Sequence, residues 1–203
     1  MLDSAAMDVH PVRLEGRIIH LEPLTLAHAP ALWRQADPEI FQWVLEWPRD
    51  ASFEAFEEWM RTRVLEAPAS LPFVILLAAT GEPVGVTSYL EIRPAHRGLE
   101  IGRTWIARAH QGTRVNPESK YLLLRHAFET LGAVRVQFKT DLNNHHSQRA
   151  IEKLGASREG VLRQYQMRSN GTFRDTVMYS VIRDEWPGVK ARLEQRLGAA
   201  QTS

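Results

Sequence analysis

The feature that most constrains this chain is an apolar strand-like run that leads, through a polar turn, into a well-formed helix start. The run is Leu99 to Ile106, the polar segment spans residues 110–118, and apolar residues then recur at helical spacing. Asn116 is expected to cap the helix, with Pro117 in its first turn and Glu118 favoured by the helix dipole. This arrangement gathers free backbone N–H groups at one point, which suits a phosphate or pyrophosphate. An ordinary β–α turn remains the alternative.

Periodicity and turn residues along the whole chain predict the order β-α-α-β-β-β-α-β-α-β-β-α. Ser52 is expected to cap an early helix, Gly155 to end a later one, and Asn170-Gly171 to form a hairpin turn. The order predicts one α/β (α+β) domain, in which a mixed, mostly antiparallel sheet carries helices on both faces. We expect a flexible tail at residues 1–11, the domain at 12–197 and a second tail at 198–203.

The amino-acid composition excludes several classes of function. The chain has 203 residues, a net charge of +1 and no Cys, so disulfides, thiolate nucleophiles and Cys-based zinc sites are excluded. The near-neutral charge gives no sign of a nucleic-acid partner. No apolar run is long enough to span a membrane, and Met1 to His10 lacks the pattern of a signal peptide. A cytoplasmic enzyme or binding protein is the expectation.

Three motifs occur in a fixed order along the chain. They are the strand start Leu99–Gly102, the loop Gln111–Asn116, and Asn144–Ser147 running on to Lys153–Ala156. In this order and spacing the chain resembles the GNAT superfamily of acetyl-CoA-dependent N-acetyltransferases. Within that superfamily it is most similar to the branch of the ribosomal-protein alanine N-acetyltransferases RimJ and RimL. The resemblance extends over nearly all of residues 12–197.

The resemblance implies a single-domain GNAT-like fold, acetyl-CoA as co-substrate, no metal, and direct attack of a primary amine on the thioester. It also implies that main-chain groups at the end of the strand hold the pantetheine arm and polarise the thioester. A homodimer is common in this branch, and neither a nucleic acid nor a membrane is expected as partner. The cofactor-binding residues so implied are Trp105, Ile106, Gln111, Gly112, Thr113, Arg114, Val115, Asn116, Asn144 and Ser147.

The chain departs from the family pattern at three positions. Arg114 stands where the family usually has Gly, and Asn116 where it has Gly or Ala. Arg114 is interpreted as pointing outward, where its charge would contact a phosphate. Ile151 stands where the family has a tyrosine, so the group that protonates the leaving thiolate stays open.

Glu100 is the candidate general base, acting directly or through a water. It is expected on the strand face shared with Gly102 and Thr104. The alternative is a solvated carboxylate, or an ion pair with Arg97 or Arg103.

Two polar residues at the start of the later helix are further candidates. The Asn144 amide is expected to bind pantetheine or the loop, although a plain N-cap is the alternative and both roles are compatible. Ser147 is the second candidate catalytic residue and is expected to contact the thiol or a phosphate. The alternative is that its hydroxyl forms a hydrogen bond with the backbone of the first helical turn. The adjacent His145 and His146 point in different directions on a helix, which disfavours a metal site.

The segment 37–50 is the candidate acceptor wall. It contains Trp43 and Trp47 in a probable loop, together with acidic residues. Aromatic faces and carboxylates both attract a cationic amine, so Trp43 and Trp47 are predicted to line the acceptor site. The alternative is that both are buried packing residues, as is expected for Trp33 and Trp59.

Three functions compete. The first is acetyl transfer from acetyl-CoA to a primary amine, either a protein N-terminus or a small molecule. The second is a catalytically silent CoA-binding sensor or scaffold of the same fold, which the Arg114 and Ile151 departures motivate. The third, a P-loop nucleotide hydrolase, is disfavoured because no Gly-Lys-Ser/Thr follows Gly112.

Overall fold

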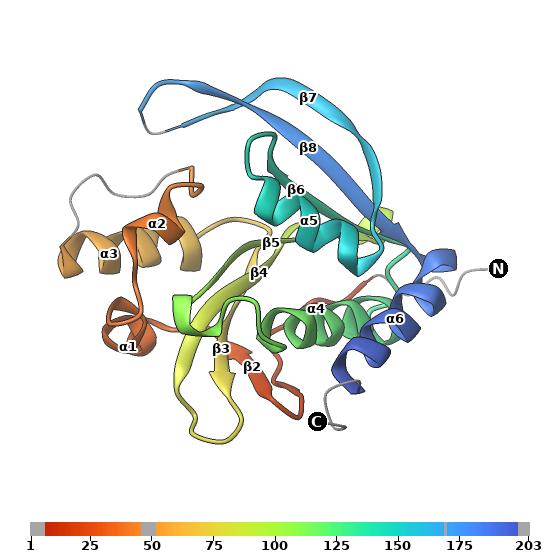
Figure 1. The fold of residues 1–203 in the computed structure, drawn as a ribbon, viewed down its shortest axis with the longest axis horizontal. Coiled ribbons are helices and arrows are strands. Elements are labelled where there is room, and N and C mark those ends of the chain that lie inside the picture. The colour runs from red at the N-terminus through yellow and green to blue at the C-terminus, as the bar shows by residue number, and fades with distance from the viewer. Residues whose placement is uncertain (1–6, 46–51, 169, 199–203) are drawn as a thin grey trace.

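One sheet of eight strands runs through the molecule in the order β1-β2-β3-β4-β5-β6-β8-β7 (Figure 1). The structure, a computed structural model, describes residues 7–45, 52–168 and 170–198. Neighbouring strands are antiparallel except β5 and β6, which are parallel. The prediction of a mixed, mostly antiparallel sheet is therefore confirmed. The strands are Leu14–Glu15 (β1), Ile19–Pro23 (β2), Leu71–Leu77 (β3), Pro83–Arg93 (β4), Gly98–Ile106 (β5), Arg135–Asp141 (β6), Ser157–Met167 (β7) and Phe173–Ile182 (β8).

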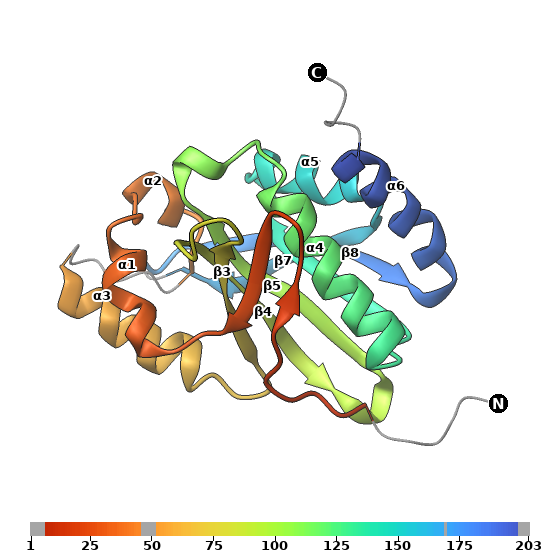
Figure 2. The same ribbon diagram turned by 90° about the horizontal axis from the view of Figure 1, so that it is seen from below.

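Helices cover both faces of the sheet, as predicted, and α1 to α3 lie apart from α4 to α6 (Figure 2). The larger core contains Leu99 of the sheet and Leu123 of α4, whereas the smaller core contains Phe41 of α2 with Val86 and Trp105. The helices are Ala29–Trp33 (α1), Pro38–Phe41 (α2), Phe53–Trp59 (α3), Val115–Arg125 (α4), His145–Leu154 (α5) and Trp186–Gly198 (α6). Short π-helical segments extend α3 to residue 65 and α4 to residue 130.

Local sequence signals set several element boundaries. The Ser52 hydroxyl caps α3 by accepting from the Ala55 N–H at 3.2 Å. Gly155 ends α5 in the left-handed region, with φ of 104°, which costs a glycine little. Asn170 and Gly171 lie in the turn between β7 and β8, and the φ of Gly171 is 84°. These three predictions are confirmed.

A buried carboxylate joins the N-terminal hairpin to α4. Glu118 accepts the backbone N–H groups of Arg17, Ile18 and Ile19 at 3.0, 2.7 and 2.8 Å. A Cβ placed on Gly16 would lie 2.7 Å from Glu118 Cδ, so this turn needs glycine. The contact fixes the start of α4 against β1 and β2.

The described residues nearest the N-terminus pack against the domain. Met7, the first described residue, is buried in the larger core at 3% exposure. The expected tails at 1–11 and 198–203 stay predictions. Among the residues with described structure, no helix has the length and apolarity needed to cross a membrane.

Candidate functional site

The loop between β5 and α4 is held by its own polar side chains. Gln111 donates from Nε2 to the Ile106 carbonyl at 3.0 Å, and Thr113 donates its hydroxyl to the His110 carbonyl at 2.7 Å. Gly112 has a φ of 74°, and nothing lies within 4 Å of the position its Cβ would occupy. The loop is therefore shaped without a ligand and has open space above its glycine.

The start of α4 differs from the prediction. The helix begins at Val115 with Arg114 as its N-cap residue, and Asn116 lies inside the first turn. The prediction that Asn116 caps the helix is wrong because the Arg114 carbonyl already accepts the Glu118 N–H at 3.0 Å. The Asn116 Oδ1 is buried and has no hydrogen-bond partner.

Arg114 is exposed and points away from the loop, as interpreted from the sequence. Its guanidinium donates to the carbonyl of Leu197, near the end of α6, at 3.3 Å. Contact of Arg114 with a phosphate therefore stays a prediction.

β5 and β6 part from each other partway along their length. They pair only from Gly98 with Arg135 to Glu100 with Gln137. Beyond these residues, β5 continues to Ile106 and β6 to Asp141 without pairing to each other. The unpaired strand ends leave backbone donors and acceptors facing a gap in the sheet, directly before the loop that starts α4.

A β-bulge lies at the point where the two strands part. Arg103 has a φ of 49°, and the register between β4 and β5 shifts there. Ile101 belongs to the larger core, whereas Trp105 belongs to the smaller core on the opposite face, so the alternation reverses between them. The prediction that Glu100 and Thr104 share a face is therefore wrong, because one extra residue in the strand turns Thr104 toward α4.

Glu100 is buried on the face opposite α4. Its Oε2 lies 3.0 Å from Lys139 Nζ and 3.3 Å from Gln137 Nε2, and Lys139 also lies 2.5 Å from Glu91 Oε1. The ion pair of Glu100 is thus with Lys139, where the sequence suggested Arg97 or Arg103. Burial raises the pKa of Glu100, and the charge and hydrogen bond of Lys139 oppose that rise.

The N-terminus of α5 has the expected polar residues. Asn144 caps the helix, since its Oδ1 accepts the Ser147 N–H at 3.0 Å. Ser147 itself is half-buried. The cap prediction is confirmed, whereas contacts of Asn144 and Ser147 with a ligand stay predictions.

The aromatic residues expected at the acceptor wall are only partly described. Trp43 follows α2 and is 36% exposed, so it is available to a ligand. Trp47 lies outside the described residues. Trp105 and Ile106 have buried side chains, and Trp105 packs edge-on against Phe41 with ring centroids 5.2 Å apart. A role for the Trp105 and Ile106 backbone fits this burial.

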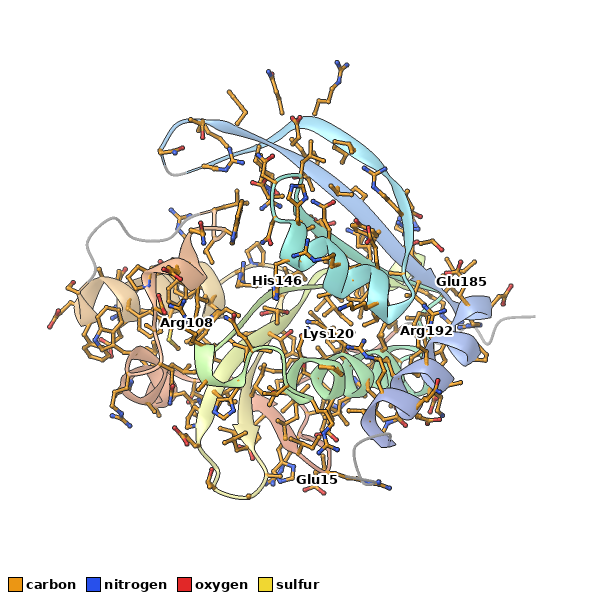
Figure 3. All side chains as sticks on the ribbon, in the orientation of Figure 1. Glu15, Arg108, Lys120, His146, Glu185 and Arg192 are labelled. Atoms are coloured by element: carbon orange, nitrogen blue, oxygen red, sulfur yellow. The ribbon has the colours of Figure 1, made fainter. Side chains whose placement is uncertain are left out.

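Sequence reasoning missed Lys120. It lies on α4 near the centre of the molecule (Figure 3), is 9% exposed, and donates from Nζ to Thr104 Oγ1 at 2.6 Å. The available signal was its place on the helix face of Leu123, Leu124 and Ala127, where a lysine is unusual.

No cluster of three or more His, Cys, Asp or Glu side chains suited to a metal occurs in the described part of the chain. His146 lies at the N-terminal end of α5 (Figure 3), and both it and His145 are exposed.

Comparison with known proteins points to one family. The sequence profile described as "Acetyltransferase (GNAT) domain" matches residues 19–157. A crystal structure from T. thermophilus, provisionally described as an acetyltransferase, is 48% identical with a TM-score of 0.88, covering 94% of this chain and all of that one. The chain is also similar to the uncharacterized N-acetyltransferase YoaA of Bacillus subtilis, at 34% identity over 51% of this chain and 58% of YoaA.

The chain spans less than two thirds of the length of three curated relatives, since these alignments cover 58, 59 and 64% of those proteins. A Mycobacterium smegmatis RimJ structure in complex with CoA-disulfide shares the fold, with a TM-score of 0.74 and 23% identity over 92% of this chain and 93% of that one.

Proposed function

This chain belongs to the GNAT family of acetyltransferases, and we propose that it transfers an acetyl group from acetyl-CoA to a primary amine by direct attack on the thioester. The observation that carries the proposal is the gap between β5 and β6, which opens directly before the loop that starts α4. The unpaired strand ends offer main-chain hydrogen bonds to an extended arm such as pantetheine. The free N–H groups of the helix start suit a pyrophosphate.

Several residues of the chain fit coenzyme A. We assign the loop from Gln111 to Asn116 to the pyrophosphate, because the open space at Gly112 and the start of α4 lie here. We assign the backbone of Trp105 and Ile106 to the pantetheine arm, with Asn144 and Ser147 on the opposite side of the gap. The structural neighbour RimJ, which shares the fold, is in complex with a CoA compound, and this supports CoA as the ligand of the fold.

Glu100 is proposed as the general base. Amine attack requires loss of a proton, and an α-amino group has a pKa near ~8. Burial raises the pKa of Glu100, which brings a carboxylate closer to the value that a base needs near neutral pH. Glu100 would take the proton directly or through a water, beside the contact between Lys139 and Glu91.

The acceptor site is proposed on the Glu100 face, with Trp43 as one wall. Trp43→Ala should raise KM for the amine and leave acetyl-CoA affinity unchanged, because Trp43 follows α2, which packs on the face opposite α4. The matched control is Trp33→Ala, whose ring packs 5.4 Å from that of Phe56 and whose loss should reduce stability instead. Parallel losses for both substrates in Trp43→Ala would refute the wall assignment.

The acceptor is proposed to be a protein N-terminus or a small-molecule amine, and a cytoplasmic homodimer is the expected form. The decisive experiment is a screen for release of CoA thiol from acetyl-CoA across peptides, amino acids, polyamines and aminoglycosides. Turnover with one class supports the transferase. Calorimetric binding of CoA without turnover on any class would favour the silent sensor, and absence of binding at millimolar CoA would refute both.

A further inference from the structure

Lys120 is a buried amine without an acidic partner. Its Nζ donates to Thr104 Oγ1 at 2.6 Å and, at a longer 3.4 Å, to Thr87 Oγ1. Among the residues that the structure describes, no carboxylate forms an ion pair with it. Burying a charge that is not paired costs free energy. A lysine retained at such a position, beside the gap in the sheet, suggests a task in the reaction.

The charged groups on the elements around Lys120 are engaged elsewhere. On α4 itself, Glu118 accepts backbone N–H groups of the N-terminal hairpin. On α6, Glu194 accepts the Tyr121 hydroxyl. On the sheet, Glu100 faces away from α4 toward Lys139. Within the described residues, the hydrogen-bond partners of Lys120 are therefore the hydroxyl groups of Thr104 and Thr87.

Thr104 connects Lys120 to the gap. It follows the bulge at Arg103, is exposed, and lies on the face of the sheet that α4 covers. Its Oγ1 lies 2.8 Å from Thr87 Oγ1, and its own hydrogen has only the Gly102 carbonyl at 3.4 Å as backbone acceptor among the described residues. When Thr87 and Lys120 both donate to Thr104 Oγ1, the Thr104 hydrogen can turn toward a ligand in the gap.

We propose that Lys120 supplies, through the Thr104 hydroxyl, the proton that the departing CoA thiolate takes up. The inference rests on the proposed function. The amine nitrogen attacks the carbonyl carbon, and the C–S bond breaks with its electron pair on sulfur. Sulfur takes the hydroxyl proton of Thr104 while the Thr104 oxygen takes a proton from the Lys120 ammonium, which water later restores. The surplus proton of the amine leaves to Glu100 on the opposite face.

Two further observations fit this role. Burial lowers the pKa of Lys120 to about 7, close to the value that a thiol of ~8.5 reaches beside a cation, so the pKa values of the two groups are matched for proton transfer. Ile151 packs against the larger core and has no proton to give. Lys120 and Thr104 would thus supply the proton that the Ile151 side chain cannot supply.

The first test compares Lys120→Met and Thr104→Val with the control Lys190→Met, which changes a lysine on α6 paired to Glu129. General acid catalysis typically contributes ~10²-fold or more, so kcat should fall by about that factor in Lys120→Met. KM for acetyl-CoA should change little, and Lys190→Met should retain kcat. The melting temperature of Lys120→Met should stay equal or rise, because a buried charge is removed.

The second test does not depend on turnover. The thiol of CoA bound to the enzyme is titrated through the ultraviolet absorbance of its thiolate. A cation within ~4–6 Å lowers the pKa of an acid by about 1–3 units. Loss of this cation in Lys120→Met should therefore raise the pKa of the bound CoA thiol by about 1–3 units. Lys120→Arg keeps the charge but cannot release a proton near neutral pH, so it should keep a low thiol pKa and still lose kcat.

Equal thiol pKa values in the wild-type protein and Lys120→Met, or a wild-type kcat in Lys120→Met, would overturn the proposal. If Lys120→Met does not fold, Thr104→Val provides the test, because Thr104 is exposed and its replacement should be tolerated. A wild-type kcat in Thr104→Val would then refute the proton path through Thr104. A wild-type protein that binds no CoA would instead refute the proposed function.

Discussion

Replacing Glu118 by Gln isolates the contact that holds the N-terminal hairpin against α4. The carboxylate is 4% exposed and accepts three backbone N–H groups from Arg17, Ile18 and Ile19. Ile18 and Ile19 share Oε2, whereas Arg17 bonds Oε1. A glutamine keeps one acceptor oxygen for the first pair and turns an NH₂ group toward the N–H of Arg17.

The expected loss in stability follows from this geometry. A hydrogen bond to a charged group is worth ~1.5–3 kcal/mol and a neutral one ~0.5–1.5 kcal/mol. One charged bond is lost, and two become neutral. Because the Arg17 N–H is only partly buried and water can reach it, we expect a total of about 3 kcal/mol. For a chain of this size that corresponds to a fall in melting temperature of about 6–12 °C.

Urea unfolding and differential scanning calorimetry measure the effect. Glu54→Gln is the matched control, since Glu54 also lies in the first turn of a helix but is exposed; it should cost less than ~1 kcal/mol. Gly16→Ala should disturb the same contact from the other side, so its effect and that of Glu118→Gln should not be additive. A change in Glu118→Gln no larger than in the control would refute the reasoning.

Three further predictions concern the site and its support. Because burial raises the pKa of Glu100, its carboxyl group stays protonated to higher pH in the folded protein than in the unfolded chain. The unfolding free energy should therefore fall as pH rises from 4.5 through the pKa of Glu100 in the folded protein. Calorimetry of Glu100→Gln should show no such dependence on pH. In kinetics, Glu100→Gln should lower kcat and shift the pH profile to the alkaline side, because removal of the proton from the amine then falls to solvent. Arg114→Ala should weaken CoA binding by ~1–3 kcal/mol in isothermal titration. An unchanged affinity would show that Arg114 bonds the Leu197 carbonyl and does not contact CoA. Gly85→Ala would place a Cβ 2.3 Å from the Trp105 carbonyl oxygen, so urea unfolding should show a loss of ~1–3 kcal/mol, and a neutral result would contradict the close approach of the two strands.

Features set by neighbouring residues could be predicted from the sequence. Ser52 and Asn144 cap their helices because a side-chain oxygen reaches an N–H three residues on. The turn at Asn170-Gly171 needs only the conformational freedom of those two residues. The order of elements and the three motifs follow from the same local chemistry, which is why the family resemblance is visible before the fold.

Features that depend on distant contacts could not be predicted. Glu118 looks like a helix-dipole residue in the sequence, but its partners lie 99 to 101 positions away. At the bulge the residue with positive φ is Arg103 and not its neighbour Gly102. Strict alternation along the strand therefore predicts the wrong face for Thr104. Lys120 carries a charge, which is typical of a surface residue, although its neighbours on the helix face are apolar.

The gap between β5 and β6 places two free strand edges inside the sheet instead of at its rim. Free edges are sites where an extended chain can add as a further strand, and most proteins cover or shorten them. An arm bound in the gap would act as that missing strand. Amide hydrogen exchange should therefore slow at residues 101–106 and 138–140 when CoA binds, with little change in β3. The ligand-free protein, by the same reasoning, should be the form more prone to aggregate through this edge.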